Sequence, residues 1–556
     1  MTEDHFSARE SVAGKAGSLL TRRQVLQWLG ALGGSSMALG AMGAWDLRAK
    51  PIGPRPDLTG TARAQGTRVI ILGAGVSGMI VGYELSRLGY VYRVLEARDR
   101  VGGLCWSVRR GDAHTELGPS GETQICQFDP GQYFNAGAWR LPHDHTGILD
   151  YVKELDIRLE PFNDMNEAFF SENPALGPMA NRKIHLREIS SDMWGHTTEL
   201  LAKALNQGSL DDTLAMEDKE LLIEFLVDAG YLDSADQVYR PNVRARGSAD
   251  AYDLSALLQV PFRNQVRSLT SNTGGPVPVF QPTGGMQEIP EGFARYHGPR
   301  ITMNARVISI RSLEDEVHVV WEDTRTGTRQ EEVSDYVVSC LPMSVLKQLD
   351  VSFPPNVAPV IQAYGHSSSS KMGFQMGRRF WEEQDKIYGG HLQFQAYDAT
   401  AAGGGSGAAG GGGGGSATGL SNPLPSFSYP SNDYGSKKGI LLGFYGNPNI
   451  SGVDGVPLID SPVRMRFEHV LTHASKVHPQ MRTELESGYA VMWPKVPFSE
   501  GAWANRPGEN MSLLSQAHGR IYLGSAAISD APAWLEGAVE SAWRTVETLH
   551  QRVVNE

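Results

Sequence analysis

A glycine-rich turn followed by a lone acid is the first group of residues in the chain that could bind a ligand. Gly73, Gly75 and Gly78 follow an apolar run at residues 69–72, and Glu96 follows the next such run. In this pattern the first glycine permits a tight turn, the second lets the backbone approach a pyrophosphate, and the third lets a helix pack on the strand. The helix N-terminus attracts phosphate, and the acid can hydrogen-bond a ribose. The pattern therefore predicts a dinucleotide site.

The elements that must position these residues follow from the same stretch. Residues 69–72 are all apolar, as in a strand of a parallel sheet covered on both faces. We expect a helix at residues 79–88, ended by Gly89, and a second strand at residues 92–95. Strand, glycines, helix, strand and acid in this order indicate a dinucleotide more strongly than the glycines alone.

Length, charge and cysteine content limit the possible functions. The 556 residues predict two or three domains, and a formal net charge of −12 argues against nucleic acid as a partner. Cys105, Cys126 and Cys340 are too few for a disulfide framework and lack metal-ligand spacing, so we expect ordinary thiols and no metal site.

The N-terminus has the features of a targeting segment. Arg22 and Arg23 precede a weakly apolar stretch rich in Gly, Ala and Ser at residues 28–45, and Ala62 and Ala64 suit a signal peptidase. The segment resembles a Tat export signal that is cleaved after Ala64. We therefore expect folding in the cytoplasm, a periplasmic or secreted location and no stable membrane span after processing. A disordered tail or an uncleaved anchor are the alternatives.

The residues after Glu96 carry a family resemblance. The stretch EARDRVGG at residues 96–103 resembles the flavin amine oxidase family, which includes L-amino acid oxidases and amino-acid 2-monooxygenases. In that family the stretch wraps the FAD pyrophosphate and the flavin, but Leu104 stands where the family usually has arginine. The implied fold is α/β (α+β) with two domains: a Rossmann-type FAD domain and a substrate domain with a mixed sheet and a helical part.

Further stretches resemble the family in the same order along residues 68–549, and they imply site residues. Arg140 would grip a substrate carboxylate, with Tyr445 as a second ligand. Lys371 would lie one water from the reactive flavin nitrogen and is the implied catalytic residue. Trp534 would form an aromatic wall beside the substrate, and Trp503 would stack near the ring.

The same resemblance implies the cofactor contacts. Ala502 occupies the position where some relatives anchor FAD through cysteine, so we expect noncovalent FAD. The implied cofactor-binding residues are Gly73, Ala74, Gly75, Ser77, Gly78, Glu96, Ala97, Arg98, Gly102, Gly103, Ala138, Trp139, Arg140, Val307, Gly524, Ser525, Trp534 and Ala538.

The predicted domains are discontinuous, because the FAD-type stretches occur in separate blocks. We expect a signal and linker at 1–64, FAD-binding parts at 65–149, 266–345 and 501–556, a helical substrate-cavity domain at 150–265, and a substrate-binding sheet domain at 346–500 with a disordered glycine-rich loop at 401–419.

The resemblance implies oxidation of an L-amino acid to a 2-oxo acid, ammonia and hydrogen peroxide, with O₂ as the second substrate. Three alternatives remain: an amino-acid 2-monooxygenase that yields an amide, an amine or polyamine oxidase, and a flavin-binding protein without turnover. A homodimer is a further hypothesis.

Overall fold

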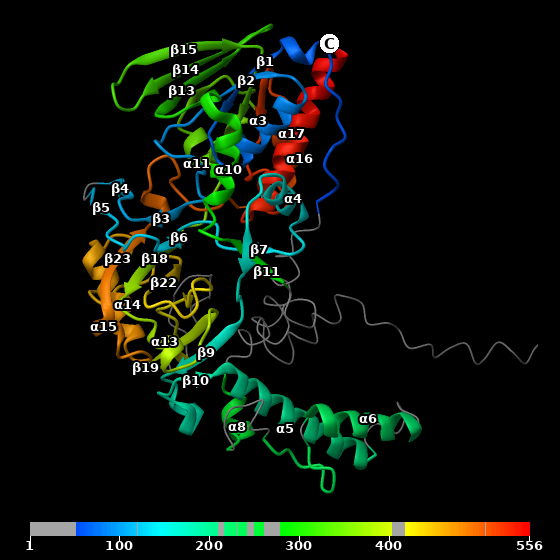
Figure 1. Ribbon diagram of the computed structural model, residues 1–556, viewed down its shortest axis with the longest axis vertical. Coiled ribbons are helices and arrows are strands. Elements are labelled where there is room, and N and C mark those ends of the chain that lie inside the picture. The colour runs from blue at the N-terminus through cyan, green and yellow to red at the C-terminus, as the bar shows by residue number, and fades with distance from the viewer. Residues whose placement is uncertain are drawn as a thin grey trace, which may run out of the picture. The chain divides into compact units, whose positions relative to one another are not determined.

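The computed structural model describes residues 52–118, 121–208, 216–230, 232–241, 250–260, 278–402, 418–505 and 508–556 (Figure 1). The twin-arginine segment and the core of the glycine-rich loop, residues 403–417, lie outside the described residues. In the part of the chain that is described, no helix has both the length and the apolar character needed to cross a membrane.

A five-stranded parallel sheet carries the glycine-rich turn. The first strand lies at its centre, as expected of a doubly wound α/β sheet. In spatial order the strands are β12 (Ile301–Thr302), β2 (Val91–Leu95), β1 (Arg68–Leu72), β16 (Tyr336–Ser339) and β24 (Ile521–Leu523).

Successive residues of β1 point to opposite faces of this sheet, and both faces are covered. Val69 and Ile71 pack into one core, with helices α3 (Val76–Arg87), α10 (Glu288–His297) and α17 (Leu535–Asn555). Ile70 and Leu72 pack into a second core, together with residues of an antiparallel sheet. The predicted buried parallel strand is confirmed, and the helix begins three residues earlier than expected, at Val76.

The antiparallel sheet of the second core has the order β15-β14-β13-β17, and β15, β14 and β13 lie side by side in Figure 1. Its strands are β13 (Ala305–Ser312), β14 (Val317–Asp323), β15 (Arg329–Ser334) and β17 (Asp350–Val351). In the sequence, β17 is preceded by α11 (Met343–Leu346) and followed by α12 (Ala358–Gln362).

A second large sheet is mixed and has its own core. Its order is β10-β9-β19-β21-β22-β18-β23, with β20 on β19. Every residue of β18 is buried, because this strand lies between β22 and β23 and is covered on both faces. The elements are β9 (Asn166–Ser171), β10 (Ile184–His185), β18 (Ser370–Met376), β19 (His391–Ala402), β20 (Thr418–Ser421), β21 (Phe427–Ser428), β22 (Gly439–Gly446), β23 (Leu485–Val491), α13 (Phe380–Glu383), α14 (Val463–Ala474) and α15 (Met481–Glu484).

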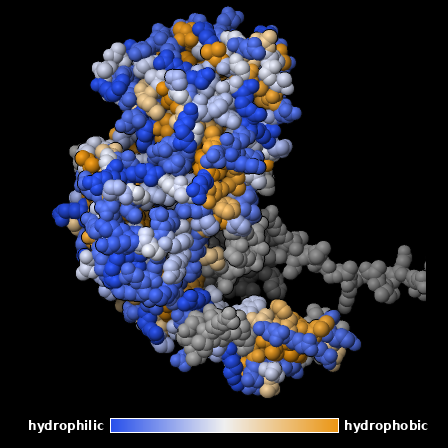
Figure 2. Space-filling model, viewed as in Figure 1, coloured by the Kyte–Doolittle hydropathy of each residue, from blue (hydrophilic) through white to orange (hydrophobic). Residues whose placement is uncertain are grey.

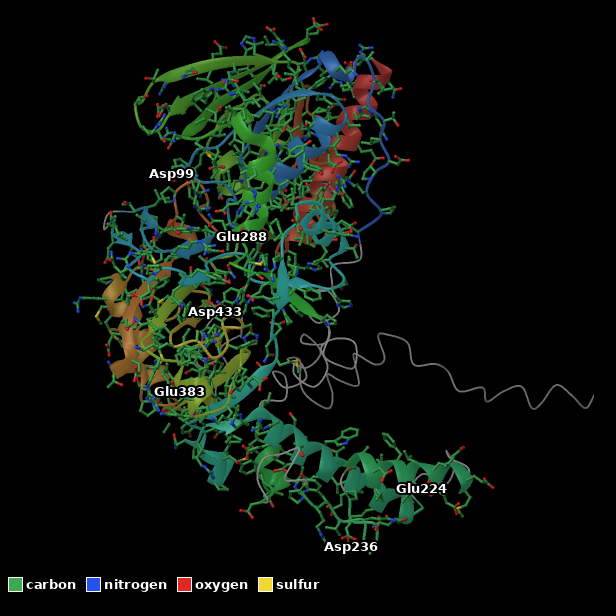
Figure 3. All side chains as sticks on the ribbon, viewed as in Figure 1. Asp99, Glu224, Asp236, Glu288, Glu383 and Asp433 are labelled. Carbon is green, nitrogen blue, oxygen red and sulfur yellow. The ribbon has the colours of Figure 1, made fainter. Side chains whose placement is uncertain are left out.

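The expected helical domain at 150–265 contains strands as well as helices, since β8, β9 and β10 fall within it. Its helices expose apolar side chains, including Trp194, Leu221 and Phe225 (Figure 2). Glu224 and Asp236 are also on this part (Figure 3). The bounds are α4 (Thr146–Glu154), α5 (Leu186–Asn206), α6 (Met216–Gly230), α8 (Leu254–Leu257) and β8 (Leu159–Pro161).

Short elements connect these sheets. They are β3 (Ser107–Arg109) with β6 (Tyr133–Asn135), β4 (Ala113–Thr115) with β5 (Thr123–Ile125), β7 (Leu141–Pro142) and β8 with β11 (Val279–Pro282), α16 (Met511–Leu514), and the 3-10 turns η1 (Ala64–Gly66), η2 (Pro174–Met179), η3 (Gly298–Arg300), η4 (Trp493–Lys495) and η5 (Gly508–Asn510).

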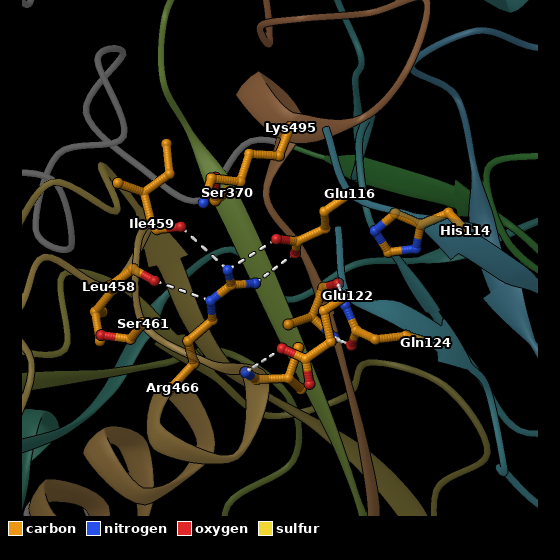
Figure 4. A network of polar contacts seen from close by, with 12 residues as sticks. His114, Glu116, Glu122, Gln124, Ser370, Leu458, Ile459, Ser461, Arg466 and Lys495 are labelled. Atoms are coloured by element: carbon orange, nitrogen blue, oxygen red, sulfur yellow. Dashed lines mark hydrogen bonds and ion pairs between the residues drawn. The ribbon is translucent and has the colours of Figure 1, made fainter. Parts of the chain in front are cut away.

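A buried ion pair joins helix α14 to the chain after β4 (Figure 4). Arg466 donates to both carboxylate oxygens of Glu116, and its Nε donates to the Leu458 carbonyl at 2.9 Å. Its side chain also donates to the Ile459 carbonyl at 3.1 Å. All three guanidinium nitrogens therefore have acceptors, which a buried charge requires.

Glu116→Ala should lower the free energy of unfolding by about 3–5 kcal/mol, because it leaves a buried guanidinium unpaired. Glu468→Ala is the matched control, since it removes the half-exposed partner of Arg482 and should cost at most about 1 kcal/mol. Urea unfolding of both variants at a fixed cofactor concentration measures the difference. Equal losses would contradict the structural role.

Residues 52–64, which fall within the expected leader, pack against the parallel-sheet unit. Arg55 forms ion pairs with Glu84 on α3 and Glu154 on α4, and its guanidinium lies 4.8 Å from the Tyr151 ring centre. Ala64 is completely buried in η1. The bond after Ala64 is thus poorly presented to a peptidase in the folded protein.

If the N-terminal segment is removed on export, we predict that the cleavage leaves residues 52–64 attached to the mature protein. A chain beginning at Ile52 should be more stable than one beginning at Gln65 by about 2 kcal/mol, because the shorter chain loses the charge-assisted hydrogen bonds from Arg55 to Glu84 and Glu154. Thermal unfolding of the two chains and N-terminal sequencing of the exported protein test this. An exported protein that starts at Gln65 and unfolds at the same temperature would refute it.

Candidate active site

The glycine turn has the geometry that a pyrophosphate site needs. Gly73 has φ +93°, and a Cβ on Gly78 would lie 2.0 Å from the Gly73 carbonyl oxygen, so only glycine lets α3 start so close to β1. A Cβ on Gly75 would meet no heavy atom within 4 Å among the described residues. The open space therefore lies at the glycine that is expected to face phosphate.

The start of α3 is available to an anion. Gly75 is the N-cap, no side chain caps the helix, and its first turn carries no acid. Backbone N–H groups and the helix dipole consequently favour negative charge at this point. Gly102 and Gly103 continue the same wall, because Gly102 bridges to Gly75 and Gly103 has φ +57°.

Glu96 is buried at the end of β2 and is held by backbone donors. Its carboxylate accepts from the Ala74 N–H at 2.8 Å and from the Arg98 N–H at 2.9 Å. A carboxylate can accept about four hydrogen bonds, so lone pairs remain for ribose hydroxyls. Glu96 thus fits the role predicted from the sequence.

Two arginines follow Glu96, and sequence reasoning had selected only the first. Arg98 donates to the Pro497 carbonyl at 2.6 Å and to Ser499 Oγ at 2.7 Å, which ties this segment to the chain after η4. Arg100 donates to the Gly103 carbonyl at 3.0 Å. Burial lowers the pKa of both guanidinium groups, so a nearby diphosphate would favour their charged forms.

The other predicted cofactor residues come from several segments, some beside this turn and others on different elements. Ser77 Oγ donates to the Ala538 carbonyl at 3.2 Å and so joins the starts of α3 and α17. Val307 is buried on β13, where the pairing with β14 shifts register. Gly524 and Ser525 follow β24, and both are buried. Ala97 and Ala138 are partly buried.

A short backbone segment after β6 is held by the second sheet. Lys371 Nζ on β18 donates to the carbonyls of Asn135 at 3.0 Å and Gly137 at 2.7 Å. The Trp493 indole N–H donates to the carbonyl of Ala136 between them at 2.8 Å. Three successive carbonyls are therefore occupied, and the segment leads directly into Trp139 and Arg140.

Lys371 is almost completely buried, and both burial and the charge of Arg140 lower the pKa of its amine. A neutral amine has two N–H donors, which match the two carbonyls, and one lone pair that can accept. The neutral form is thus the one that suits this environment.

Trp139 is the centre of the aromatic cluster. Its ring lies 5.5 Å from Tyr445, 5.2 Å from His391 and 5.2 Å from Phe162, measured between ring centroids. Lys371 Nζ lies 5.0 Å from the centroid of the Trp139 ring and 4.5 Å from the centroid of the Tyr445 ring. Lys371 on β18 and Tyr445 on β22 are paired across the two strands. The predicted Lys371 and Tyr445 therefore lie together.

Arg140 lies between two tryptophans. Its guanidinium carbon is 5.3 Å from the Trp139 centroid and 5.1 Å from the Trp534 centroid. Its Nε atom is 3.0 Å from Asp164 Oδ2, and among the described residues this is its single ion pair. The terminal nitrogens are thus the edge on which a carboxylate could bind.

Trp534 forms the N-cap of α17 and stacks edge-on with His145, 4.9 Å between centroids. The first turn of α17 carries Glu536, whose carboxylate accepts from the backbone N–H groups of Gly147 and Ile148, each at 2.9 Å. Glu536 therefore caps α4, and burial raises its pKa. His145 is also buried, which lowers the pKa of its imidazole to about 4.

One further core cluster has four partly buried residues packed against it: Leu104, Trp139, Tyr445 and Trp503. The backbone at residue 503 is held next to β18, since the Trp503 carbonyl accepts from the Ser367 N–H at 2.8 Å. Leu104 thus contributes apolar surface to this cluster.

Asp164 and His391 are site residues that sequence reasoning missed. Asp164 lies between β8 and β9, and His391 begins β19. Neither occurs in a recognisable motif, so nothing short of strand pairing could bring them next to Arg140.

Gly75→Ala should load far less dinucleotide cofactor while keeping the fold, because the added methyl group enters the open space rather than a packed contact. Gly66→Ala is the control, since its Cβ also meets nothing within 4 Å and it lies outside the turn. Cofactor content per mole of purified chain and circular dichroism report the two properties. Full loading of Gly75→Ala would contradict the assignment of the turn.

Comparison with known proteins identifies the family of this chain. Residues 76–550 match the model of the flavin containing amine oxidoreductase family. The chain is 24% identical over 520 residues to the flavin-dependent L-tryptophan oxidase RebO of Lentzea aerocolonigenes, covering 87% of this chain and 98% of the relative. It is 24% identical over 514 residues to an L-amino-acid oxidase of Siganus canaliculatus, covering 88% and 86%. A solved structure of putrescine oxidase bound to putrescine has a TM-score of 0.52 at 15% identity, covering 88% of this chain and 99% of that chain.

Proposed function

Because this chain belongs to the flavin-containing amine oxidoreductases, we propose that it is an FAD-dependent oxidase of an L-α-amino acid. The observation that carries the proposal is the Arg140 guanidinium, held between Trp139 and Trp534 in the same cluster as Lys371 and Tyr445. The net reaction consumes the amino acid, O₂ and water, and it yields a 2-oxo acid, ammonia and hydrogen peroxide.

The residues of the glycine turn would hold FAD. Gly75 and the start of α3 would receive the pyrophosphate, and Glu96 would accept from the ribose hydroxyls. Bound FAD would supply the acceptor for the hydride of the substrate α-carbon. Ala502 has no side-chain atom able to form a flavin linkage, which supports noncovalent binding.

Arg140 would bind and orient the substrate carboxylate. A planar guanidinium can form two parallel hydrogen bonds to a carboxylate, and Asp164 already occupies the Nε edge. The two tryptophan rings limit water at this group, which strengthens a charge-assisted hydrogen bond. Tyr445 on β22 would provide a further contact to the same substrate.

Lys371 would act as a fixed amine close to the reacting atoms. Its N–H groups are directed to two backbone carbonyls, so its position is fixed by the segment that carries Arg140. The remaining lone pair can accept a hydrogen bond from water and take up a proton. This role agrees with a lysine that is neutral in the buried site.

Oxidation of a simple amine is the second candidate. Asp164 is partly exposed and lies beside Arg140, so its carboxylate could receive a cationic amine instead of a substrate that carries a carboxylate. Product analysis separates the remaining alternatives: a 2-oxo acid supports the oxidase, and an amide would indicate a 2-monooxygenase. Anaerobic bleaching of the flavin by an amino acid excludes a protein without turnover.

Arg140→Met should raise KM for amino acids by about a hundredfold, because it removes charge-assisted hydrogen bonds worth roughly 3 kcal/mol to the carboxylate. Arg140→Lys keeps the charge but not the planar fork, so it should restore only part of the loss. Peroxide release is measured for amino acids and for the matching amines, which should be insensitive to either change. Unchanged KM for every amino acid would overturn the proposal.

A further inference from the structure

We infer that Asp164 is a positioning residue for the substrate-binding guanidinium of Arg140, and that His391 and Ser428 hold Asp164 in place. The inference rests on the proposed function, since it concerns how the carboxylate-binding edge of Arg140 is directed. It assigns a role to three residues that lie outside the motifs shared with the family.

The contacts form an unbroken row from a buried strand to the site. Ser428 Oγ on β21 lies 2.8 Å from His391 Nδ1 on β19. His391 Nε2 lies 3.0 Å from Asp164 Oδ1. The other carboxylate oxygen, Oδ2, lies 3.0 Å from Arg140 Nε. Each oxygen of Asp164 thus has at least one cationic or N–H partner.

The chemistry of the row determines its proton positions. A carboxylate can only accept, so His391 Nε2 carries a hydrogen and donates to Asp164. In the neutral ring Nδ1 then accepts from the Ser428 hydroxyl, which is buried and can donate in this direction. The imidazole therefore has one orientation and one tautomer.

The turn that carries Asp164 is rigid for separate reasons. Asn163 Oδ1 accepts from the Met165 N–H at 3.0 Å, and the His391 N–H donates to the Met165 carbonyl at 2.9 Å. Gly390 has φ +78°, and a Cβ there would lie 2.6 Å from that carbonyl oxygen. A glycine is required for β19 to approach this turn so closely.

Asp164 supplies Arg140 with an orientation as well as with an opposite charge. The faces of Trp139 and Trp534 attract the guanidinium but leave it free to rotate in its own plane. The Nε contact removes that freedom and directs the terminal nitrogens toward the site. The negative charge of Asp164 by itself would oppose binding of a second carboxylate.

These two contributions can be separated by substitution. Asp164→Ala removes the ion-pair partner of Arg140 Nε and should weaken carboxylate binding by about tenfold or more. Asp164→Asn keeps a polar oxygen beside Nε and removes the charge that opposes a bound carboxylate, so it should change the affinity by less than about threefold. The amide can donate to His391 Nε2 if the ring takes its other tautomer and donates from Nδ1 to Ser428.

The test uses the FAD-loaded full chain and propionate as a non-oxidised probe. The dissociation constant is obtained from the change in flavin absorbance on titration, with propylamine as the probe that lacks a carboxylate. Glu468→Ala, on the surface of α14, is the control and should leave the propionate affinity unchanged. Equal losses in Asp164→Ala and Asp164→Asn, or no loss in either, would overturn the inference.

A second pair of variants covers the case in which Asp164→Ala does not fold. Ser428→Ala alone should have an effect below about threefold, but combined with Asp164→Asn it should weaken propionate binding by about tenfold, since the inverted tautomer then lacks an acceptor. Additive effects of the two substitutions would contradict the coupling of Ser428 to Asp164 through His391. If Arg140→Met leaves propionate binding intact, the proposed function fails; if it abolishes binding while the Asp164 variants do not, only the positioning role fails.

Discussion

The candidate site depends on the hydrogen bonds that hold the backbone carbonyls of Asn135, Ala136 and Gly137. Lys371 and Trp493, which come from the mixed sheet and the turn after it, donate to all three. A buried carbonyl needs a donor, and these donors are available only when the mixed sheet is folded. The interactions therefore couple the folding of the mixed sheet to the position of the segment that carries Arg140.

This coupling gives a structural reason for a buried lysine at this position. An uncompensated ammonium would be costly at this depth, and the structure avoids the cost by favouring a neutral amine that donates to two carbonyls. The same side chain lies against Trp139 and Tyr445, so the packing of the aromatic cluster also depends on it. Structural and chemical demands on Lys371 thus coincide.

The positive charge of Arg140 is paired rather than left isolated. Arg140 is paired with Asp164, and Asp164 with His391, so the cluster presents one guanidinium edge rather than an unpaired field of positive charge. At the other part of the site, Arg98 and Arg100 follow Glu96 beside the start of α3. Both groups suit ligands that carry negative charge, a carboxylate at one and a diphosphate at the other.

Local patterns in the sequence determined the dinucleotide turn, the buried first strand and the family. A positive-φ turn at Gly73, a helix that starts near its carbonyl and an acid after β2 each depend on neighbours within about thirty residues, so their signature is local. Arg140, Lys371, Tyr445 and Trp534 could be proposed in the same way, because each lies in a stretch that resembles the family. In the structure Arg140 and Lys371 both lie against Trp139, with Trp534 beside Arg140 and Tyr445 beside Lys371.

Only the tertiary structure showed what surrounds those residues. Asp164 and His391 are 227 positions apart, and they meet because β19 runs parallel to β9 and Gly390 permits a close approach. The packing of residues 52–64 on α3 and α4 likewise depends on Glu84 and Glu154, which no leader-like pattern reveals. Strand pairing and side-chain packing between distant segments leave no periodic trace in the sequence, and for that reason they had to be seen in the fold.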